Sequence, residues 1–202
     1  MKTVVLTGGM GSGKSAVSAC LRAQGVPVYD SDSRTKSLYD RRPALVDEME
    51  AVLGTGLRDA DGRLDRRKLA GLIFSDPRKK AAVEAVVHPA VLADFRRWKR
   101  WQRPKGWTYG PVPFLVLESA IILSCPVFDG VGDKVVLVDA DEPVRAARAA
   151  ARDGSDLETA LRRIRSQSFD LSRVDLVFRN DGPLETLPAR VDLVFPNLFL
   201  PL

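Results

Sequence analysis

Residues 8–15, which read GGMGSGKS, match the complete phosphate-binding pattern G-x-x-x-x-G-K-[ST]. Residues 3–7 before this loop are apolar and β-branched, which predicts a buried parallel strand, and residues 15–24 after it predict a helix that ends at Gly25. A strand, a glycine turn and a helix N-terminus in this order present backbone N–H groups to an anion. The alternative is a glycine-rich turn without a ligand, but the complete match in this context favours a loop that binds a nucleoside triphosphate.

Two side chains of this loop have roles that phosphate chemistry predicts. Lys14 can reach the β- and γ-phosphates of a bound nucleotide, and the Ser15 hydroxyl can ligate Mg²⁺. A nucleoside triphosphate together with Mg²⁺ is therefore the expected ligand.

The size and composition of the chain narrow the possible classes. With 202 residues, of which 45% are hydrophobic and 28% charged, it can form one main core with a small appendage. The net charge of +5 fits an anionic ligand and also fits nucleic acid, so charge alone does not separate these two. We find no apolar run that could span a bilayer, no signal peptide before the first strand, and no metal-ligand spacing between Cys20 and Cys125. These features predict a cytoplasmic protein with reduced cysteines and no membrane partner.

Apolar runs alternate with helical stretches, which is typical of an α/β fold with a mainly parallel sheet. We expect four further strands, at 26–29, 114–117, 135–138 and 176–178. Helices are expected at 33–53 with a break at 41–43, at 66–75 with Asp65 as N-cap, at 77–87, and from His88 to about Arg103. A helical hairpin is expected at 142–152 and 156–166, with Gly154 ending its first helix and Ser155-x-x-Glu158 as the capping box of the second.

The remaining motifs favour a small-molecule kinase among the P-loop proteins. The base-reading Asn-Lys-x-Asp of GTPases does not occur, and motors and helicases are usually longer. A kinase needs a carboxylate that orients the attacking hydroxyl and accepts its proton. Asp30 and Asp32 follow the second strand, at the sheet edge where ligands bind, and we predict that Asp32 is this base. Both aspartates also suit the N-cap of the next helix, and one can cap while the other acts.

A kinase also needs a mobile basic segment that closes over the phosphates and excludes water. Arg145, Arg148 and Arg152 recur at i, i+3 and i+7, which places them on one face of a helix, and Arg162 and Arg163 follow on the next helix. Arginine suits phosphate because its planar guanidinium donates hydrogen bonds in pairs. The alternative is a solvated basic face. The absence of opposing acids at i+4 spacing favours the first interpretation, in which these arginines form a lid that closes over the phosphates.

Three other features stay open on the residues alone. His88, the only histidine, either contacts substrate, caps a helix or fills a cavity. Glu118, at the end of a predicted strand, either holds a Mg²⁺-bound water or is a solvated carboxylate. Residues 96–103, with Trp107 and Tyr109 after them, could stack on nucleic acid, but an amphipathic helix that buries Phe95 and Trp98 explains them better. No nucleic-acid partner is therefore expected.

In the order of the chain, these motifs resemble the dephospho-CoA kinase family over nearly the whole length. The matching elements are Leu6–Ser15, Val28–Asp32 with its Asp-x-Asp, Arg67–Leu69 with Ile73-Phe74 and His88-Pro89, Arg148-x-x-x-Arg152-Asp153, Arg163-Ile164-x-x-Gln167, Asp175, and Asn180-Asp181-Gly182. The resemblance implies transfer of the γ-phosphoryl group of ATP to the ribose 3′-hydroxyl of dephospho-CoA, with ATP and Mg²⁺ required.

The resemblance and the local chemistry together give a set of candidate site residues. The expected catalytic residues are Asp32, Lys14 and Arg148. The expected ATP ligands are Gly9, Met10, Gly11, Ser12, Gly13, Lys14, Ser15, Arg148 and Asn180. The expected substrate contacts are Asp30, Asp32, His88, Glu118 and Arg163. The expected Mg²⁺ ligand is Ser15, with Glu118 acting through water.

The expected fold is a P-loop nucleoside-kinase-like, three-layer α/β fold with a mainly parallel five-stranded sheet. Its core comprises about 1–32, 111–141 and 168–202, its helical substrate-binding insertion about 33–110, and its helical lid about 142–167. The alternatives are a kinase for nucleoside monophosphates or another metabolite, and a nucleotide- or nucleic-acid-binding protein without catalysis. The oligomeric state does not follow from the sequence.

The chain departs from the family pattern in three places. Ala120–Ser124 replaces the usual Pro-Leu-Leu-x-Glu and lacks its acid, and the stretch 168–179 is a few residues shorter than usual. The apolar C-terminus, 195–202, either packs on the core or contacts another subunit.

Overall fold

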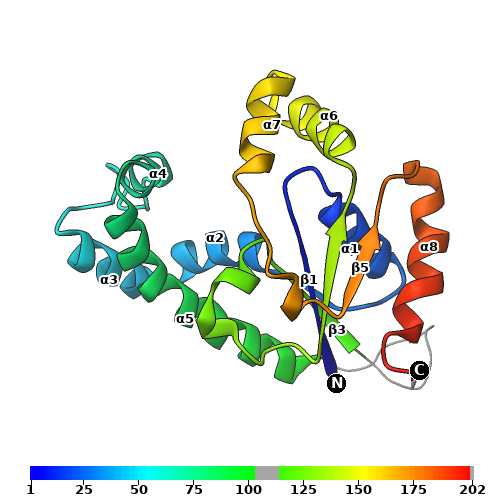
Figure 1. Ribbon diagram of the computed structural model, residues 1–202. Coiled ribbons are helices and arrows are strands. Elements are labelled where there is room, and N and C mark those ends of the chain that lie inside the picture. The colour runs from blue at the N-terminus through cyan, green and yellow to red at the C-terminus, as the bar shows by residue number, and fades with distance from the viewer. Residues whose placement is uncertain (103–113, 201–202) are drawn as a thin grey trace. The chain divides into compact units, whose positions relative to one another are not determined.

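The computed structural model describes residues 1–102 and 114–200. It divides into two compact units, Met1–Asp30 with Gln102–Leu202, and Ser31–Trp101, whose elements are labelled in Figure 1. The helical unit thus begins at Ser31 and ends at Trp101, whereas we expected 33–110. Residues 103–110, together with Trp107 and Tyr109, lie outside the described residues. No helix in the described part of the chain combines the length and apolar character needed to cross a bilayer.

The first unit is built on a five-stranded parallel sheet with the order β2-β3-β1-β4-β5. The strands are β1 (Lys2–Gly8), β2 (Val28–Asp30), β3 (Phe114–Glu118), β4 (Lys134–Asp139) and β5 (Leu176–Arg179). All five were predicted, but β2 starts two residues later than expected. Val26 donates its N–H to Leu21 at the end of the preceding helix, and Pro27 has no N–H to give to the ladder. Pairing with β3 therefore begins at Val28.

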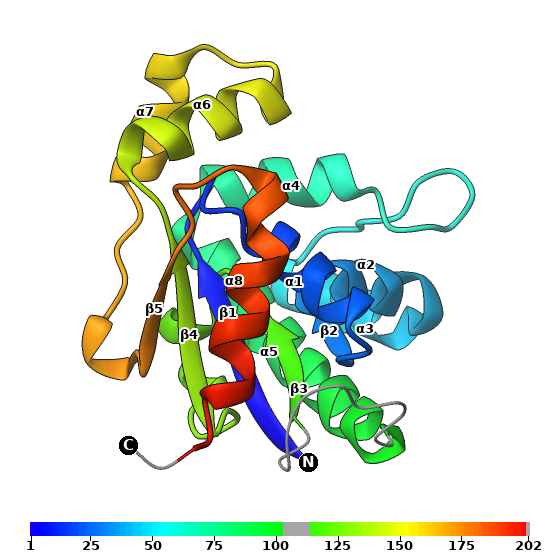
Figure 2. The ribbon, with the colours of Figure 1, turned by 90° about the vertical axis from the view of Figure 1, so that its right-hand side faces the viewer.

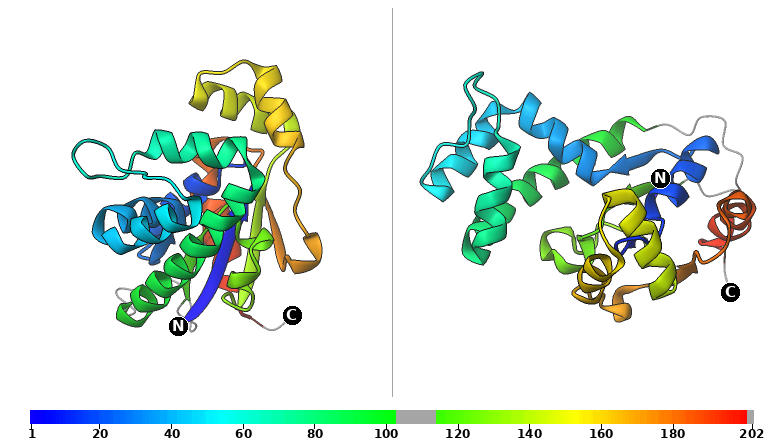
Figure 3. Two further views of the ribbon diagram at one scale, coloured as in Figure 1. Left: turned by 90° about the vertical axis from the view of Figure 1, so that its left-hand side faces the viewer. Right: turned by 90° about the horizontal axis from the view of Figure 1, so that it is seen from above.

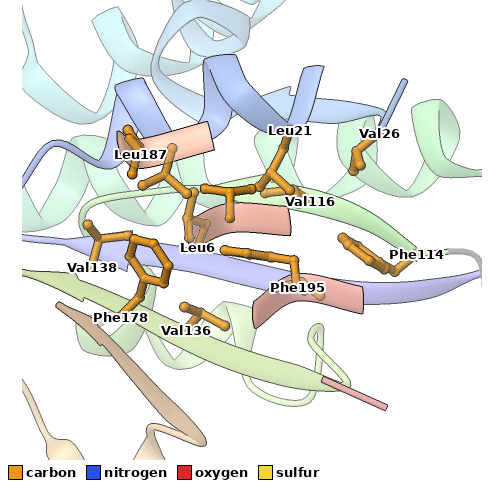
Figure 4. Packing of buried hydrophobic residues seen from close by; sticks show 13 residues of the cluster. Leu6, Leu21, Val26, Phe114, Val116, Val136, Val138, Phe178, Leu187 and Phe195 are labelled. Carbon is orange, nitrogen blue, oxygen red and sulfur yellow. The ribbon is translucent and has the colours of Figure 1, made fainter. Parts of the chain in front are cut away.

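Buried side chains lie on both faces of this sheet. One face carries the main cluster, drawn in Figure 4, in which Leu6 and Val116 of the sheet belong to the same buried core as Leu21 of α1 (Lys14–Ala23) and Leu187 of α8 (Leu187–Val194). Figure 2 shows α8 alongside α1. The residues that alternate with this set, Val5, Leu115, Leu117 and Leu137, are buried as well. Strands buried on both faces are expected in a parallel α/β sheet, and the predicted fold class is confirmed.

The C-terminal segment packs on the core. Phe195, in the short 3₁₀ turn Phe195–Asn197, is fully buried, with its ring centroid 6.5 Å from Phe114 and 5.8 Å from Phe178. Leu198 and Phe199 pack against the same cluster. Of the two alternatives left open for this tail, packing on the core is the one observed.

A hairpin of α6 (Glu142–Asp153) and α7 (Leu157–Arg165) follows β4, and its small core is Ala146, Ala149, Ala160 and Ile164. Gly154 caps α6 with φ 62°, as predicted. The predicted capping box at Ser155 is wrong. The N-cap of α7 is Asp156, whose carboxylate accepts from the Thr159 N–H at 2.7 Å, and a carboxylate caps as well as a serine hydroxyl.

The second unit consists of α2 (Ser31–Arg41), α3 (Pro43–Leu53), α4 (Arg66–Ser75) and α5 (Pro77–Trp101), and Figure 3 shows the long loop between α3 and α4. Asp65 caps α4 by accepting from the N–H groups of Arg67 and Lys68, as predicted. The expected break before His88 is wrong, because α5 runs through Pro89 without interruption. Val87 and Val91 are buried on either side of Pro89, and this packing holds the helix together despite the missing N–H.

Candidate active site

The phosphate-binding loop joins the end of β1 to the start of α1, as the sequence predicted. Gly11 and Gly13 have φ of 74° and 87°, a conformation that glycine adopts readily and other residues rarely. A Cβ on Gly13 would also lie 2.2 Å from Nδ2 of Asn180. Because α1 begins at Lys14, the loop leads directly into the N-terminus of this helix, which carries the positive end of the helix dipole and favours an anion.

Glu118, the last residue of β3, contacts both functional side chains of the loop. Its Oε1 accepts a hydrogen bond of 3.0 Å from Lys14 Nζ and one of 3.1 Å from Ser15 Oγ. Arg22 adds a longer ion pair of 3.6 Å to Oε2. Only 5% of the Glu118 side chain is exposed, so these contacts compensate a buried charge. A solvated carboxylate, one of the two roles left open for Glu118, is therefore ruled out.

The donors gathered at this point suit a triphosphate that carries Mg²⁺. The Ser15 hydroxyl and the Glu118 carboxylate are hard oxygen donors, which Mg²⁺ prefers, and Mg²⁺ commonly completes its shell with water and substrate phosphates. No group of three or more His, Cys, Asp or Glu side chains among the described residues is arranged to hold a metal ion. One hydroxyl and one carboxylate fit an ion that arrives with its nucleotide.

Asn180 connects the phosphate-binding loop to Arg148. Its buried side chain donates from Nδ2 to the Ser12 carbonyl at 2.9 Å. Arg148 donates to the Asn180 carbonyl at 2.8 Å and to the Gly182 carbonyl at 3.4 Å. Two residues predicted as ATP ligands are thus brought to the loop, and backbone carbonyls hold the guanidinium of Arg148.

The two aspartates of the Asp-x-Asp element lie in different units. Asp30 ends β2 and pairs in register with Glu118, so carboxylates end two neighbouring strands at the same edge of the sheet. Asp32 lies exposed in the first turn of α2, because this helix already begins at Ser31. Asp32 is therefore inside the helix and is not its N-cap.

The basic face predicted on α6 divides into three separate sets of contacts. Arg145 contacts the phosphate-binding loop, Arg148 the carbonyls after β5, and Arg152 the carboxylate of Asp153 at 2.8 Å. Arg163 of α7 is 3.5 Å from the same carboxylate. The pKa of Asp153 lies below its ordinary value, chiefly because Arg152 donates a hydrogen bond to it. Asp153 was not predicted, because only acids at i+4 spacing from the arginines were considered and this residue directly follows Arg152.

His88, predicted as a substrate contact, lies half-buried in the middle of α5. Burial lowers the pKa of the imidazole below its ordinary value, while Glu84 raises it and Lys80 lowers it by smaller amounts. Because α5 is continuous, His88 does not cap a helix start.

One charged cluster at the edge of the sheet was not predicted. Arg179, the last residue of β5, pairs with Asp139 at 2.9 Å, with Asp181 at 3.0 Å, and with Asp141. The signal was present in the sequence, since these acids lie at the end of β4 or within two residues after β4 and β5, and the carboxyl ends of parallel strands lie at the same edge. The cluster fixes the segment that carries Asn180.

With this geometry established, comparison with known proteins assigns the chain. A family model described as dephospho-CoA kinase matches residues 2–185. The chain belongs to the dephospho-CoA kinase family. Curated relatives named dephospho-CoA kinase include one from Porphyromonas gingivalis, 40% identical over 198 residues that cover 96% of this chain and 93% of the relative. Another, from Frankia casuarinae, is 36% identical over 201 residues that cover 98% of this chain and 84% of the relative.

Solved structures support the family fold. The protein TT1252 from Thermus thermophilus is 32% identical, with a TM-score of 0.77 and coverage of 98% of this chain and 97% of that one. A dephospho-CoA kinase from Campylobacter jejuni has a TM-score of 0.67 at 19% identity, covering 98% of both chains. A shikimate kinase from Bacteroides thetaiotaomicron has a TM-score of 0.55 at 14% identity, covering 98% of this chain and 99% of that one. At these low identities the last two show the fold alone.

Two of the departures from the dephospho-CoA kinase pattern lie next to one another. Arg173, in the turn Leu171–Arg173 within the shortened stretch, donates to the Leu123 carbonyl at 2.6 Å and pairs with Asp129. Ala120, Ser124 and Phe169 line a common cavity of 230 Å³. The altered 120–124 segment and the shortened stretch are thus packed together.

Proposed function

We propose that this member of the dephospho-CoA kinase family transfers the γ-phosphoryl group of ATP to the ribose 3′-hydroxyl of dephospho-CoA, giving coenzyme A and ADP. The observation that carries the proposal is the joint contact of Lys14 and Ser15 with the buried Glu118 at the loop. A buried carboxylate beside the Lys and Ser of the loop is suited to hold Mg²⁺ at the phosphates through water. The family match over residues 2–185 supplies the acceptor.

In the proposed mechanism the triphosphate lies over the N-terminus of α1, where backbone N–H groups and Lys14 neutralise the charge of the transferring group. Ser15 and Glu118 would hold Mg²⁺, Ser15 directly and Glu118 through water. When bound, Mg²⁺ adds positive charge at the β- and γ-phosphate oxygens. Lys14 exchanges its contact with Glu118 for one with the phosphates, so the ion pair keeps the lysine near the loop beforehand.

Asp32 is the proposed base, which orients the 3′-oxygen in line with the γ-phosphorus and takes its proton as the bond to phosphorus forms. Its exposure in the first turn of α2 supports the proposal, because a base must be accessible to the acceptor. Asp30, His88 and Arg163 are the proposed acceptor contacts.

Arg148 is proposed to move from its carbonyl partners onto the phosphates when the α6–α7 hairpin closes as a lid. Exchange of neutral carbonyl partners for an anionic phosphate is favourable, because charge-assisted hydrogen bonds are the stronger ones. An arginine in this role contributes about 10³-fold or more to the rate.

The experiment that tests the function measures ADP release with dephospho-CoA and, separately, with AMP, shikimate and gluconate, each with ATP and Mg²⁺. The proposal expects rapid turnover with dephospho-CoA only. Turnover with another acceptor and none with dephospho-CoA would assign the site to a different small-molecule kinase. The cytoplasmic location and the absence of a nucleic-acid partner stay predictions.

A further inference from the structure

Met10, at the crest of the phosphate-binding loop, has both of its backbone polar groups held by side chains from the α6–α7 hairpin and its exit. Gln167, two residues after α7, accepts from the Met10 N–H through Oε1 at 2.8 Å. Arg145 of α6 donates from Nε to the Met10 carbonyl at 3.0 Å, and its Nη2 donates to the same Gln167 oxygen at 3.4 Å. We call this ring of Met10, Arg145 and Gln167 the loop clasp.

The side chain of Met10 adds an apolar contact to the clasp. It packs against the small core of the hairpin, formed by Ala146, Ala149, Ala160 and Ile164. Figure 1 shows the loop after β1 approaching α6 and α7. The crest is therefore fixed to the hairpin on two backbone atoms and on its side chain.

The glycines next to Met10 make this close approach possible. A Cβ on Gly9 would lie 2.2 Å from Nη2 of Arg145 and 2.9 Å from Oε1 of Gln167. A Cβ on Gly11 would lie 2.1 Å from the backbone oxygen of Arg145. These distances are far below van der Waals contact, so part of the glycine requirement of this loop comes from Arg145 and not from phosphate.

All three nitrogens of the Arg145 guanidinium contact other groups of the protein. Nε and Nη2 serve the clasp, and Nη1 is 3.5 Å from the carboxylate of Asp139. Only 13% of the side chain is exposed. Arg148, one turn further along α6, donates instead to two backbone carbonyls. It can exchange these neutral partners for an anion. Arg145 and Arg148, two of the three arginines of the predicted basic face, thus differ in what they can do.

We propose that Arg145 and Gln167 are positioning residues that hold the crest of the loop in its nucleotide-binding conformation through the backbone of Met10. They act on the nucleotide through the loop and make no contact with the phosphates. The inference rests on the proposed function only in taking the loop as the nucleotide site. A consequence is that the ends of the hairpin that carry Arg145 and Gln167 stay with the loop, so the closure that brings Arg148 onto the phosphates moves the part of the hairpin beyond these two residues.

The test measures the Kd for MgADP by calorimetry and the KM for ATP and dephospho-CoA. Arg145→Lys keeps the positive charge but loses the planar guanidinium that places one nitrogen at Met10 and another at Gln167, and Gln167→Leu removes the acceptor. Both should weaken MgADP binding about tenfold and raise the KM for ATP similarly, with kcat and the KM for dephospho-CoA within about twofold. Arg165→Gln is the matched control. This substitution breaks the 2.7 Å ion pair between Arg165 and Glu142, which joins α6 to α7 and does not involve the loop. It should leave the Kd for MgADP and the KM for ATP unchanged.

A double-mutant cycle tests whether the effect of a side chain at Gly9 depends on Arg145. Gly9→Ala should weaken MgADP binding in the wild-type background, because the new methyl group displaces Arg145 and Gln167. In the Arg145→Ala background the same change should cost severalfold less, since the obstructing guanidinium is gone. These variants also carry the test if Gln167→Leu does not fold.

Three results would overturn the inference. Near-normal MgADP binding by Arg145→Lys would show that charge, and not the two-sided contact, is what matters. An equal effect of Arg165→Gln would show that hairpin stability alone matters. Additive effects in the cycle would show that Gly9 and Arg145 act independently. Because MgADP binding involves no acceptor, these outcomes are distinct from a failure of the proposed reaction.

Discussion

Lys14 and Glu118 form a 3.0 Å ion pair that links the phosphate-binding loop to the carboxyl end of β3, with only 13% and 5% of their side chains exposed. Ser15 donates to the same carboxylate oxygen. The pair places a lysine and a hydroxyl, both suited to a metal-bound triphosphate, against one buried acid.

Glu118→Gln tests this arrangement. We expect kcat/KM to fall about 10- to 100-fold, the usual range for removing a residue that orients a metal ligand, and the Mg²⁺ concentration for half-maximal rate to rise. The measurement is a Mg²⁺ titration of the steady-state rate. Glu185→Gln, at an exposed carboxylate, is the control. An unchanged Mg²⁺ dependence would remove Glu118 from the metal site.

Asp32→Asn tests the proposed base. The amide cannot accept the proton of the 3′-hydroxyl, so we expect kcat to fall about 10²- to 10⁴-fold while MgATP binding stays normal. Steady-state kinetics and calorimetry check the two halves. Asp40→Asn on the same helix loses only an exposed ion pair with Arg66 and should be close to wild type. A kcat within a few fold of wild type would refute the role of Asp32.

Asn180→Ala removes the 2.9 Å hydrogen bond to the Ser12 carbonyl and leaves that buried oxygen unsatisfied. We expect the free energy of unfolding to fall by about 1–3 kcal/mol and the KM for ATP to rise. Asn197→Ala, which loses a similar 2.8 Å bond to Leu193 far from the loop, separates stability from function. It should lower stability without changing the KM. If both variants change the KM alike, Asn180 has no special link to the loop.

His88 predicts a pH dependence of stability. Because burial lowers its pKa in the folded state below the ordinary 6.5, the unfolded chain binds the proton more tightly. The stability that neutral His88 contributes is complete above pH 6.5 and is lost as the pH falls toward the lower, folded pKa. We expect the melting temperature of His88→Gln to change less with pH over this range than that of the wild type. His88 is the only histidine, so an identical slope in the variant would show that it is not the titrating group.

Phe195→Ala tests whether the C-terminal segment belongs to the core. This fully buried ring stacks on Phe114 and packs at a tilt against Phe178, so we expect a loss of about 3–5 kcal/mol in the free energy of unfolding. Urea unfolding of the variant is compared with that of Leu193→Ala, whose side chain is 71% exposed and whose loss should be small. A loss below about 1 kcal/mol would contradict the packing of the tail.

The parts of the fold that the sequence predicted correctly are those set by local chemistry. The strand, glycine loop and helix around Lys14 follow from a contiguous pattern. The acids at the strand ends, Glu118 and Asp139, lie at one edge because parallel strands all end there. The cap at Asp65 was also correct, since an N-cap depends on the next three residues.

The errors and omissions come from packing between distant residues. Pro89 predicted a helix break, but buried neighbours on both sides keep α5 continuous. The hydrogen bond from Met10 to Gln167 joins residues 157 positions apart, so no spacing rule could find it. Arg145 looked equivalent to Arg148 on a helical wheel. Only the contact with the loop separates a positioning arginine from one that can move.

The most direct test of the central claim follows ³¹P resonances while the purified protein acts on dephospho-CoA with ATP and Mg²⁺. We predict one new phosphomonoester resonance, at the ribose 3′-position, formed in equal amount to ADP by the wild type, and at least 100-fold more slowly by Asp32→Asn. ADP formation without this resonance, or equal rates in the two proteins, would contradict the account.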